Sequence, residues 1–130
     1  MENNNKKKLI MIIDDDKFLL DMYSIKFSEN SFEIETATSG PEALRKIEDG
    51  LTPDIFLVDI VMPTMDGFEL MQELAQKFKN NKVLIFLSNL GQKEDIERGL
   101  SIGADGYIVK ASTTPTEVVN KVLEIANNKK

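Results

Sequence analysis

Four apolar segments of this chain each run into polar residues that are capable of chemistry. Segment 9–13 precedes Asp14, Asp15 and Asp16, segment 55–58 precedes Asp59, segment 83–87 precedes Ser88, and segment 107–109 precedes Lys110. If the segments are parallel strands of one buried sheet, the polar residues meet along its carboxyl edge, where open α/β sheets place their ligands. Crowded carboxylates repel one another unless a cation lies among them, and hard oxygen ligands favour Mg²⁺, which also bridges to phosphate oxygens.

Asp59 is the best candidate for a nucleophile. It ends an apolar segment, and the loop that follows contains Pro63 and Gly67, which would leave the carboxylate exposed at the edge of the sheet. A carboxylate that attacks phosphorus forms an aspartyl phosphate. Asp14 and Asp15 would hold Mg²⁺, which neutralises charge on the attacking carboxylate and on the phosphoryl oxygens.

A hydroxyl and an amine complete the set. Ser88 would donate a hydrogen bond to a phosphoryl group, and Lys110 would pair with another of its oxygens as a point charge. Each residue alone has a plainer interpretation, because an acid after a strand is usually a turn former or a helix cap, as fits Asp16 best. Tyr107 fits either a core residue or a side chain that swings between packed and exposed positions, and its type favours the core. Four strand ends that supply compatible chemistry together favour the functional interpretation.

The elements that would position these residues alternate regularly along the chain. Strands are expected at 9–13, 32–36, 54–58, 83–87 and 106–109. The helices between and after them are marked by Phe18, Met22 and Ile25, by Ala43, Leu44 and Ile47, by Met71, Leu74, Ala75 and Phe78, by Ile96 and Leu100 within 92–102, and by Val118, Val119, Val122, Leu123 and Ile125. The result is five β/α units and a single doubly wound α/β domain with a parallel sheet.

Helix start and stop signals support this division. Ser39 with Glu42 has the capping-box pattern, and the sequence Thr114, Pro115, x, Glu117 opens the last helix in the same way. Gly99 weakens the prediction of the fourth helix, because glycine in a helix interior is unfavourable. We expect the domain to span residues 8–127, with polar tails at 1–7 and 128–130.

Composition excludes several classes of function. The chain of 130 residues has no cysteine and no histidine, which removes zinc-thiolate sites, Ser-His-Asp catalysis and a phosphohistidine donor. The net charge of -6 opposes direct binding to nucleic acid or to an anionic membrane. No apolar stretch approaches the roughly 20 residues of a membrane span, so we expect a cytoplasmic protein.

Four sequence motifs together resemble a response regulator receiver domain of two-component signal transduction. They are Ile-Ile-Asp-Asp-Asp, then Val-Asp-Ile-Val-Met-Pro-Thr-Met-Asp-Gly, then Leu-Ser-Asn, then Gly-Ala-Asp-Gly-Tyr-Ile-Val-Lys. The resemblance runs from about residue 8 to residue 127. It implies a flavodoxin-like fold of five parallel strands in the order 2-1-3-4-5, flanked by five helices.

The resemblance also implies a role for each residue. Asp14 and Asp15 match the acidic pair that holds Mg²⁺, and Asp59 matches the phosphoacceptor and a metal ligand. The backbone carbonyl of Val61 matches a further metal ligand. In the remaining motifs, Ser88 matches the switch hydroxyl, Tyr107 the switch aromatic residue and Lys110 the lysine of the family.

The implied mechanism is a phosphorylation-controlled switch rather than turnover of a separate substrate. A histidine kinase or phosphotransfer protein donates a phosphoryl group to Asp59, Ser88 moves toward it and Tyr107 turns inward. The surface formed by the fourth helix, fifth strand and fifth helix then changes for a downstream output protein or domain. The site would catalyse its own phosphorylation and dephosphorylation, and a phosphorylation-dependent homodimer is a further option.

Two features depart from the family or vary within it. The family usually has a proline after the lysine, joined by a cis peptide, whereas Ala111 follows Lys110 here. A cis bond before a residue other than proline costs about 3 kcal/mol, so the sequence leaves the geometry of this bond open. Val61 and Leu90 stand at positions that tune access of the hydrolytic water, and both are apolar. We therefore expect a comparatively long-lived phosphoryl group.

Three other interpretations stay open. An aspartate-nucleophile phosphohydrolase also places an acid after a strand, but such enzymes resemble Asp-x-Asp, and the second position after Asp59 here is Val61. A degenerate receiver would bind partners without phosphorylation, an option that Ala111 keeps open. The chain is also compatible with being the receiver part of a larger regulator.

Overall fold

The computed structural model of the chain describes residues 7–78 and 81–129. Its strands are β1 (Leu9–Ile13), β2 (Glu33–Ala37), β3 (Ile55–Val58), β4 (Val83–Ser88) and β5 (Gly106–Val109). Its helices are α1 (Lys17–Ser28), α2 (Gly40–Glu48), α3 (Gly67–Phe78), α4 (Lys93–Ile102), the short 3₁₀ helix η1 (Lys110–Ser112) and α5 (Pro115–Asn128). All five strands are parallel and lie in the order β2-β1-β3-β4-β5, which confirms the predicted fold.

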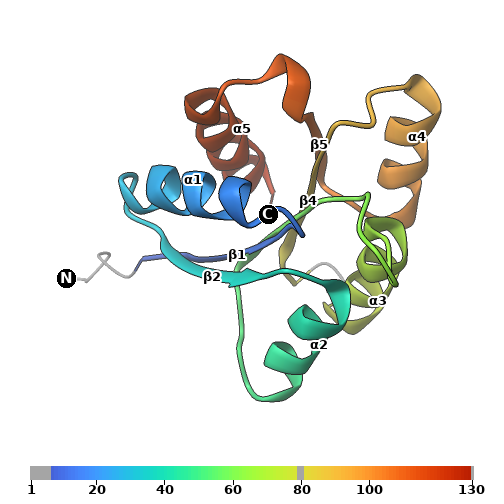
Figure 1. Cartoon of the computed structure of the whole chain (residues 1–130), viewed down its shortest axis with the longest axis horizontal. Coiled ribbons are helices and arrows are strands. Elements are labelled where there is room, and N and C mark those ends of the chain that lie inside the picture. Colours follow the sequence, from blue (N-terminus) through green and yellow to red (C-terminus); the bar gives the residue numbers. More distant parts are fainter. Residues whose placement is uncertain (1–6, 79–80, 130) are drawn as a thin grey trace.

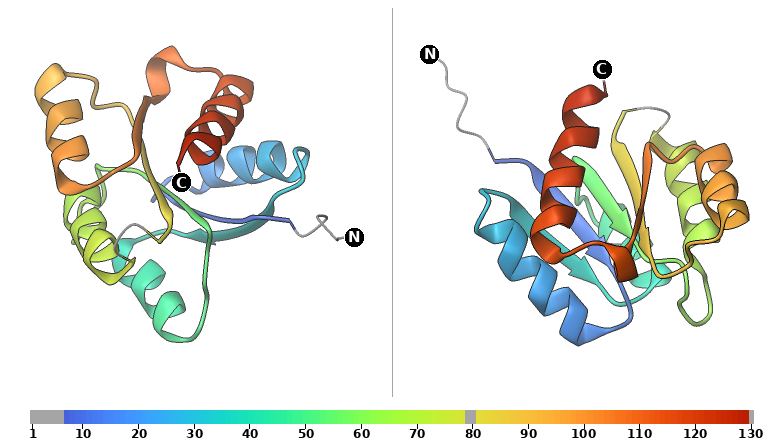
Figure 2. Two further views of the ribbon diagram at one scale, coloured as in Figure 1. Left: turned by 180° about the vertical axis from the view of Figure 1, so that it is seen from behind. Right: turned by 90° about the horizontal axis from the view of Figure 1, so that it is seen from above.

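The sheet separates two apolar layers. Figure 1 shows α1 and α5 on one face of the sheet and α2, α3 and α4 on the other, and Figure 2 gives the same arrangement from behind and from above. In β1, Ile10 and Ile12 pack toward α1 and α5, whereas Met11 and Ile13 pack toward the other three helices. Because β1 and β3 are covered on both faces, they read as continuous apolar runs that end abruptly at polar residues.

Helix α1 forms where its apolar spacing predicts, but it packs on a different face. The residues that mark the helix in the sequence include Phe18 and Ile25, whose side chains are 78% and 62% exposed. The buried residues are Leu20, Tyr23 and Phe27. The helix carries apolar residues on both sides, so periodicity alone did not identify the side that faces the core.

The predicted helix starts are confirmed, with one difference in detail. The Asp16 carboxylate accepts hydrogen bonds from the first turn of α1, and Thr114 and Glu117 form a complete capping box at α5. Ser39 Oγ accepts from the Glu42 amide, but the Glu42 carboxylate binds the Thr38 amide and hydroxyl instead of closing the box. The loop before α2 is thereby fixed by its own side chains.

Helix α4 is also present, and its packing corrects the predicted inner face. Leu100, expected to point inward, is 46% exposed, and the buried residue of the helix is Gly99. Gly103 ends the helix with a φ of 128°, as expected for a glycine stop signal. Helix α4 therefore packs on the core through Gly99 and through Ile102, which is half-buried against the same apolar layer.

The C-terminal end of α5 is tied to the sheet. The helix continues one residue into the predicted tail, to Asn128. The Lys129 ammonium donates to the Lys82 carbonyl at 2.6 Å and to the Asp105 carboxylate at 3.0 Å. Residues 1–6 and 130 of the predicted tails lie outside the described residues. Among the residues described, no helix is long and apolar enough to cross a bilayer.

Candidate functional site

The parallel register brings three carboxylates together. Ile13 pairs with Val58 across β1 and β3, so the residues that follow the two strands are neighbours. Asp14, Asp15 and Asp59 each offer an oxygen atom, and these atoms lie within 4.8 Å of one another. Asp14 and Asp59 are only 2% and 7% exposed, whereas Asp15 is open to solvent.

Lys110 directly follows the edge strand β5 and reaches these acids across the end of β4. Its ammonium is 2.7 Å from an Asp14 carboxylate oxygen and 3.6 Å from an Asp59 oxygen. Burial alone would lower the pKa of Lys110, but the hydrogen bond to Asp14 and the charge of Asp59 outweigh it and raise the pKa. The described residues contain no cis peptide bond, so the bond between Lys110 and Ala111 is trans, and the chain continues directly into η1.

The electrostatics of the site fit a divalent cation. Burial raises the pKa of Asp59 to about 6; Lys110 opposes this shift, and the charge of Asp14 reinforces it. Three carboxylates against one ammonium leave a surplus of two negative charges. Carboxylate oxygens are the ligands that Mg²⁺ prefers, so the donor set of Asp14, Asp15 and Asp59 suits this ion.

The loop after β3 holds the Asp59 carboxylate in place. The Ile60 amide donates to Asp59 Oδ1 at 2.8 Å, and the Gly67 amide donates to the Ile60 carbonyl at 2.8 Å. A Cβ at Gly67 would lie 2.1 Å from the Asp59 carbonyl oxygen, so the start of α3 approaches this backbone as only glycine can. Val61, in the same loop, has a side chain that is 63% exposed.

Thr64 gives this loop a strained backbone. Its φ is +72°, a conformation that is unfavourable for a β-branched residue. We expect Thr64→Gly to raise the free energy of unfolding by about 1 kcal/mol, measured by urea denaturation. Thr52→Gly is the matched control, because Thr52 is also exposed in a loop but is not among the described residues with positive φ. An equal effect of both changes would contradict this prediction.

The two predicted switch residues both hydrogen-bond to the backbone of Leu90. The Leu90 amide donates to Ser88 Oγ at 3.2 Å, and the Tyr107 hydroxyl donates to the Leu90 carbonyl. Ser88 is fully buried, and the half-buried Tyr107 ring packs against Phe86 with 5.6 Å between ring centroids. Tyr107 is thus partly a core residue, as its type suggests, and its hydroxyl points at the loop between β4 and α4.

The structure therefore brings together most of the residues predicted from sequence. Asp14, Asp15, Asp59 and Lys110 form one cluster, and Ser88 and Tyr107 adjoin the loop after β4. The backbone of Leu90 as the common partner of both switch residues was not predicted, because peptide hydrogen bonds leave no mark on residue type. The close approach at Gly67 was also not predicted, although a glycine at the start of a helix was a usable signal.

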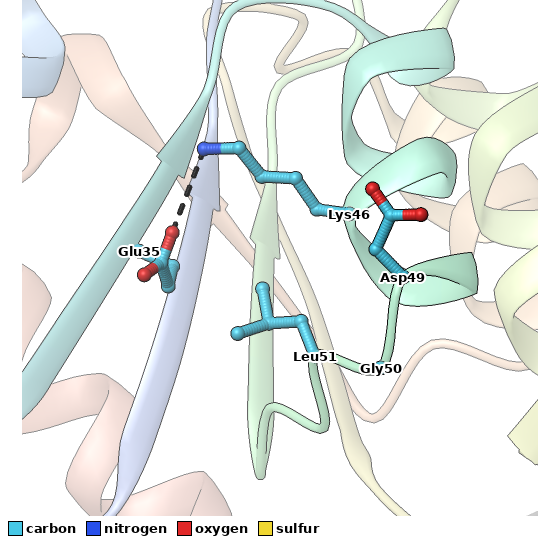
Figure 3. A pocket seen from close by; sticks show the side chains of 5 residues that line it. All are labelled: Glu35, Lys46, Asp49, Gly50 and Leu51. Atoms are coloured by element: carbon cyan, nitrogen blue, oxygen red, sulfur yellow. Dashed lines mark hydrogen bonds and ion pairs between the residues drawn. The ribbon is translucent and has the colours of Figure 1, made fainter.

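A separate hollow lies away from these residues. It is lined by Glu35, Lys46, Asp49, Gly50 and Leu51, between β2 and the end of α2 (Figure 3). The Lys46 ammonium donates to the Thr36 carbonyl at 2.6 Å and lies 3.5 Å from Glu35, so its charge is already engaged. None of the predicted site residues lines this hollow.

Comparison with known proteins gives one consistent family. A family model described as the response regulator receiver domain matches residues 10–123. The chemotaxis protein CheY of Halobacterium salinarum is 36% identical over 89 residues, which cover 68% of this chain and 72% of that protein. The response regulator SaeR of Staphylococcus aureus is 30% identical over 104 residues, which cover 80% of this chain.

The chain spans less than half of some relatives. The matched part makes up 44% of SaeR and 37% of the phosphate regulon transcriptional regulatory protein PhoB of Rhizobium meliloti, which is 35% identical over 85 residues, or 65% of this chain. The similarity to these longer proteins is therefore limited to one part of each. It gives no information on whether this chain shares the functions of their other parts.

Solved structures agree with the sequence relatives. A CheY-like receiver domain protein from Methanospirillum hungatei superposes with a TM-score of 0.87 at 29% identity, covering 95% of this chain and 97% of that one. CheY of Borrelia burgdorferi, solved as a complex with CheX, BeF₃ and Mg²⁺, gives a TM-score of 0.84 at 30% identity, covering 91% of this chain and 88% of that one. By fold, by sequence and by the acids gathered at its sheet edge, this chain belongs to the response regulator receiver domains of two-component signal transduction.

Proposed function

We propose that this receiver domain accepts a phosphoryl group on Asp59 from a histidine kinase or phosphotransfer protein. The observation that carries the proposal is the setting of Asp59, which is buried between two further acids and lies 3.6 Å from the Lys110 ammonium. The neighbouring acids suit a cation, and the Lys110 ammonium suits a phosphoryl oxygen, so both partners of the reaction would lie beside the Asp59 carboxylate. A receiver that only binds partners would have no need to bury repelling acids in this way.

The roles of the residues follow from their positions. An Asp59 carboxylate oxygen attacks phosphorus, the bond from phosphorus to the donor nitrogen breaks, and the donor histidine keeps that electron pair. Lys110, now bound to Asp14, turns toward a phosphoryl oxygen and balances its charge. Ser88 gives up its contact with the Leu90 amide, and its hydroxyl donates a hydrogen bond to another phosphoryl oxygen.

Asp14, Asp15, Asp59 and the backbone carbonyl of Val61 would hold Mg²⁺, which when bound supplies positive charge to the carboxylate and the phosphoryl oxygens. The Borrelia relative solved with Mg²⁺ and BeF₃ supports this assignment. Without the cation, the two surplus negative charges of the cluster would repel the donor phosphate. Phosphoryl acceptance should therefore depend on Mg²⁺.

The output of the domain is a change of surface. Ser88 binds the amide of Leu90 and Tyr107 binds its carbonyl, so movement of Ser88 disturbs the loop that leads into α4. We assign the surface of α4, β5 and α5 to a downstream output protein or domain, with a phosphorylation-dependent homodimer as one form of output. In this proposal the receiver domain spans residues 8–127. It acts in the cytoplasm, and it turns over no substrate besides its own phosphoryl group.

The test is intact-mass spectrometry after incubation with acetyl phosphate, with Mg²⁺ or with EDTA. A single phosphoryl adduct that forms only with Mg²⁺ is expected. Borohydride converts an acyl phosphate to an alcohol, so reduction and peptide mapping should find homoserine at position 59. Repeating the reaction with a phosphorylated phosphotransfer protein covers the case of a receiver that refuses small donors. No adduct from either donor would contradict the proposal and leave a receiver that acts without phosphorylation.

The phosphoryl group should also be long-lived. Val61 and Leu90 are apolar, so they neither bind nor orient a water molecule for attack on the phosphoryl group. We expect Val61→Asn with Leu90→Glu to speed dephosphorylation by about tenfold or more, which corresponds to roughly 1.4 kcal/mol in the barrier. Loss of the adduct is followed by mass spectrometry after the donor is removed. Val61→Leu, which stays apolar, is the control, and a change of less than twofold in the polar variant would contradict the prediction.

A further inference from the structure

Tyr107, the proposed switch residue, contacts Gly99 of helix α4. A Cβ at Gly99 would lie 2.9 Å from Cδ2 and Cε2 of Phe86 and 3.1 Å from Cδ2 of Tyr107. Real Cβ atoms essentially never lie as close to another atom as the 2.9 Å to Phe86, and the 3.1 Å to Tyr107 would be an unusually tight contact. The backbone of α4 therefore lies directly on the two rings. A glycine in the interior of a helix is costly, and this close seat explains its presence.

Besides Gly99, α4 meets the core through Ile102, a half-buried residue in its last turn. Among its residues only Gly99 is buried, and Gln92 at its start makes no capping hydrogen bond through its side chain. The Arg98 guanidinium lies 4.0 Å from the centroid of the Phe68 ring, which links α4 to α3 at the protein surface. The position of α4 therefore depends strongly on the rings beneath Gly99.

The two rings differ in their freedom to move. Phe86 is fully buried, with Phe68 and Tyr107 packed against it at centroid distances of 5.5 Å and 5.6 Å. Tyr107 lies on the edge strand β5 and is half-buried. Its hydroxyl is held by the Leu90 carbonyl in the loop before α4, so it is fixed at one end by that loop and along its ring by Gly99.

We propose that Gly99 is a positioning residue that couples the rotamer of Tyr107 to the seat of α4, an inference that rests on the switching role proposed above for Tyr107. The absence of a side chain at position 99 lets α4 stay seated while Tyr107 is turned inward. When Tyr107 turns outward, the space beneath Gly99 loses one of its two rings. The helix then shifts to restore contact, so the α4 surface changes with the ring.

The proposal predicts a specific effect of one added methyl group. In Gly99→Ala, the new Cβ competes with the Tyr107 ring for the same space, and Tyr107 is the ring that can leave. Tyr107 should therefore turn outward and lose its hydrogen bond to Leu90. Phe86 can tilt into the vacated space and relieve its own contact with the methyl group.

The experiment uses the full chain labelled with 3-fluorotyrosine and observed by ¹⁹F NMR without any phosphoryl donor. The chain has two tyrosines, Tyr23 and Tyr107, and Tyr107→Phe assigns the two signals. In Gly99→Ala, the Tyr107 signal should move toward that of free fluorotyrosine and broaden severalfold more with a soluble paramagnetic agent. The buried Tyr23 serves as the internal reference, and Ser101→Ala, exposed in the same helix, is the matched control.

A second measurement guards against a purely structural role. Gly99→Ala should lower the melting temperature of the wild-type protein but raise it in the Tyr107→Leu background, where the space is free and alanine favours the helix. If Gly99→Ala alone fails to fold, the proposal predicts that the double variant Gly99→Ala with Tyr107→Leu folds. An unmoved Tyr107 signal in folded Gly99→Ala, or an unfolded double variant, would overturn the proposal. Neither readout involves phosphorylation, so failure of Asp59 to accept a phosphoryl group would be recognised separately.

Discussion

Asp59→Asn should abolish the Mg²⁺-dependent phosphoryl adduct and make the metal-free protein more stable. Burial raises the pKa of Asp59 from 3.8 to about 6, so folding works against its ionisation. A shift of about two units corresponds to roughly 3 kcal/mol at most. This shift already includes the attraction of Lys110 for the ionised carboxylate. The buried asparagine amide still needs hydrogen-bond partners of its own, so we expect a gain of about 2 kcal/mol at pH 7.5.

The sign of the pH dependence follows from the same shift. The folded state binds the Asp59 proton more tightly, so this group costs stability as pH rises from about 4 to about 6 and costs a constant amount above that. The stability of the Asn variant should lack this loss and should meet that of the wild type near pH 4. Urea denaturation in EDTA, followed by circular dichroism, measures both.

Two controls belong to this experiment. Asp21→Asn removes a carboxylate that is exposed on α1 and should leave stability nearly unchanged. Added Mg²⁺ should narrow the difference between wild type and the Asp59 variant, because binding stabilises only the protein with the complete ligand set. A gain that is independent of pH, or no gain at pH 7.5, would argue against charge repulsion as its cause.

Gly67→Ala should be the most damaging single methyl addition in the chain. The added Cβ would lie 2.1 Å from the Asp59 carbonyl oxygen and 2.6 Å from the Ile60 Cα, and both of these are backbone atoms that cannot rotate away. We expect a loss of at least about 3 kcal/mol in the free energy of unfolding. Because one of the displaced atoms is the carbonyl oxygen of Asp59, the proposed phosphoacceptor, the folded fraction should also accept phosphoryl groups more slowly.

Gly50→Ala separates lack of space from backbone conformation. Gly50 has a φ of +111°, but a Cβ added there would have no heavy atom within 4 Å, so alanine should cost only about 1–2 kcal/mol for its backbone. Urea denaturation of both variants gives the comparison, and the rate of adduct formation gives the functional effect. Equal losses of stability at the two positions would show that the close approach at Gly67 is relieved by movement of α3.

The sequence could predict which residues lie together because these residues follow strand ends. In a parallel sheet, the residue after each buried strand is placed by topology alone, so Asp14, Asp59 and Lys110 could be brought together without knowing any side-chain packing. The resemblance supplied the strand order that makes β1, β3 and β4 central. The trans bond before Ala111, by contrast, needed coordinates, because residue type left both forms open.

The predictions that failed concern which side of a helix faces the core. In α1, Phe18 and Ile25 are as apolar as the residues that are buried, so hydrophobicity had no contrast to report. In α4, the most buried residue is Gly99, which has no side chain to indicate packing and whose type disfavours a helix. Contacts made by backbone atoms, at Gly99 and at Leu90, escape any method that reads side-chain chemistry.

The bond between Lys110 and Asp14 can form only late in folding. The two residues are 96 positions apart, whereas Asp14, Asp15 and Asp59 all belong to the first half of the chain. Closing so long a loop is entropically expensive, and β5 joins the sheet only through β4. A chain that has paired β1, β2 and β3 already holds its acids together but still lacks their counter-charge. The lysine reaches the acids only when the edge strand docks, so under the proposed function a partly folded chain would not yet accept a phosphoryl group.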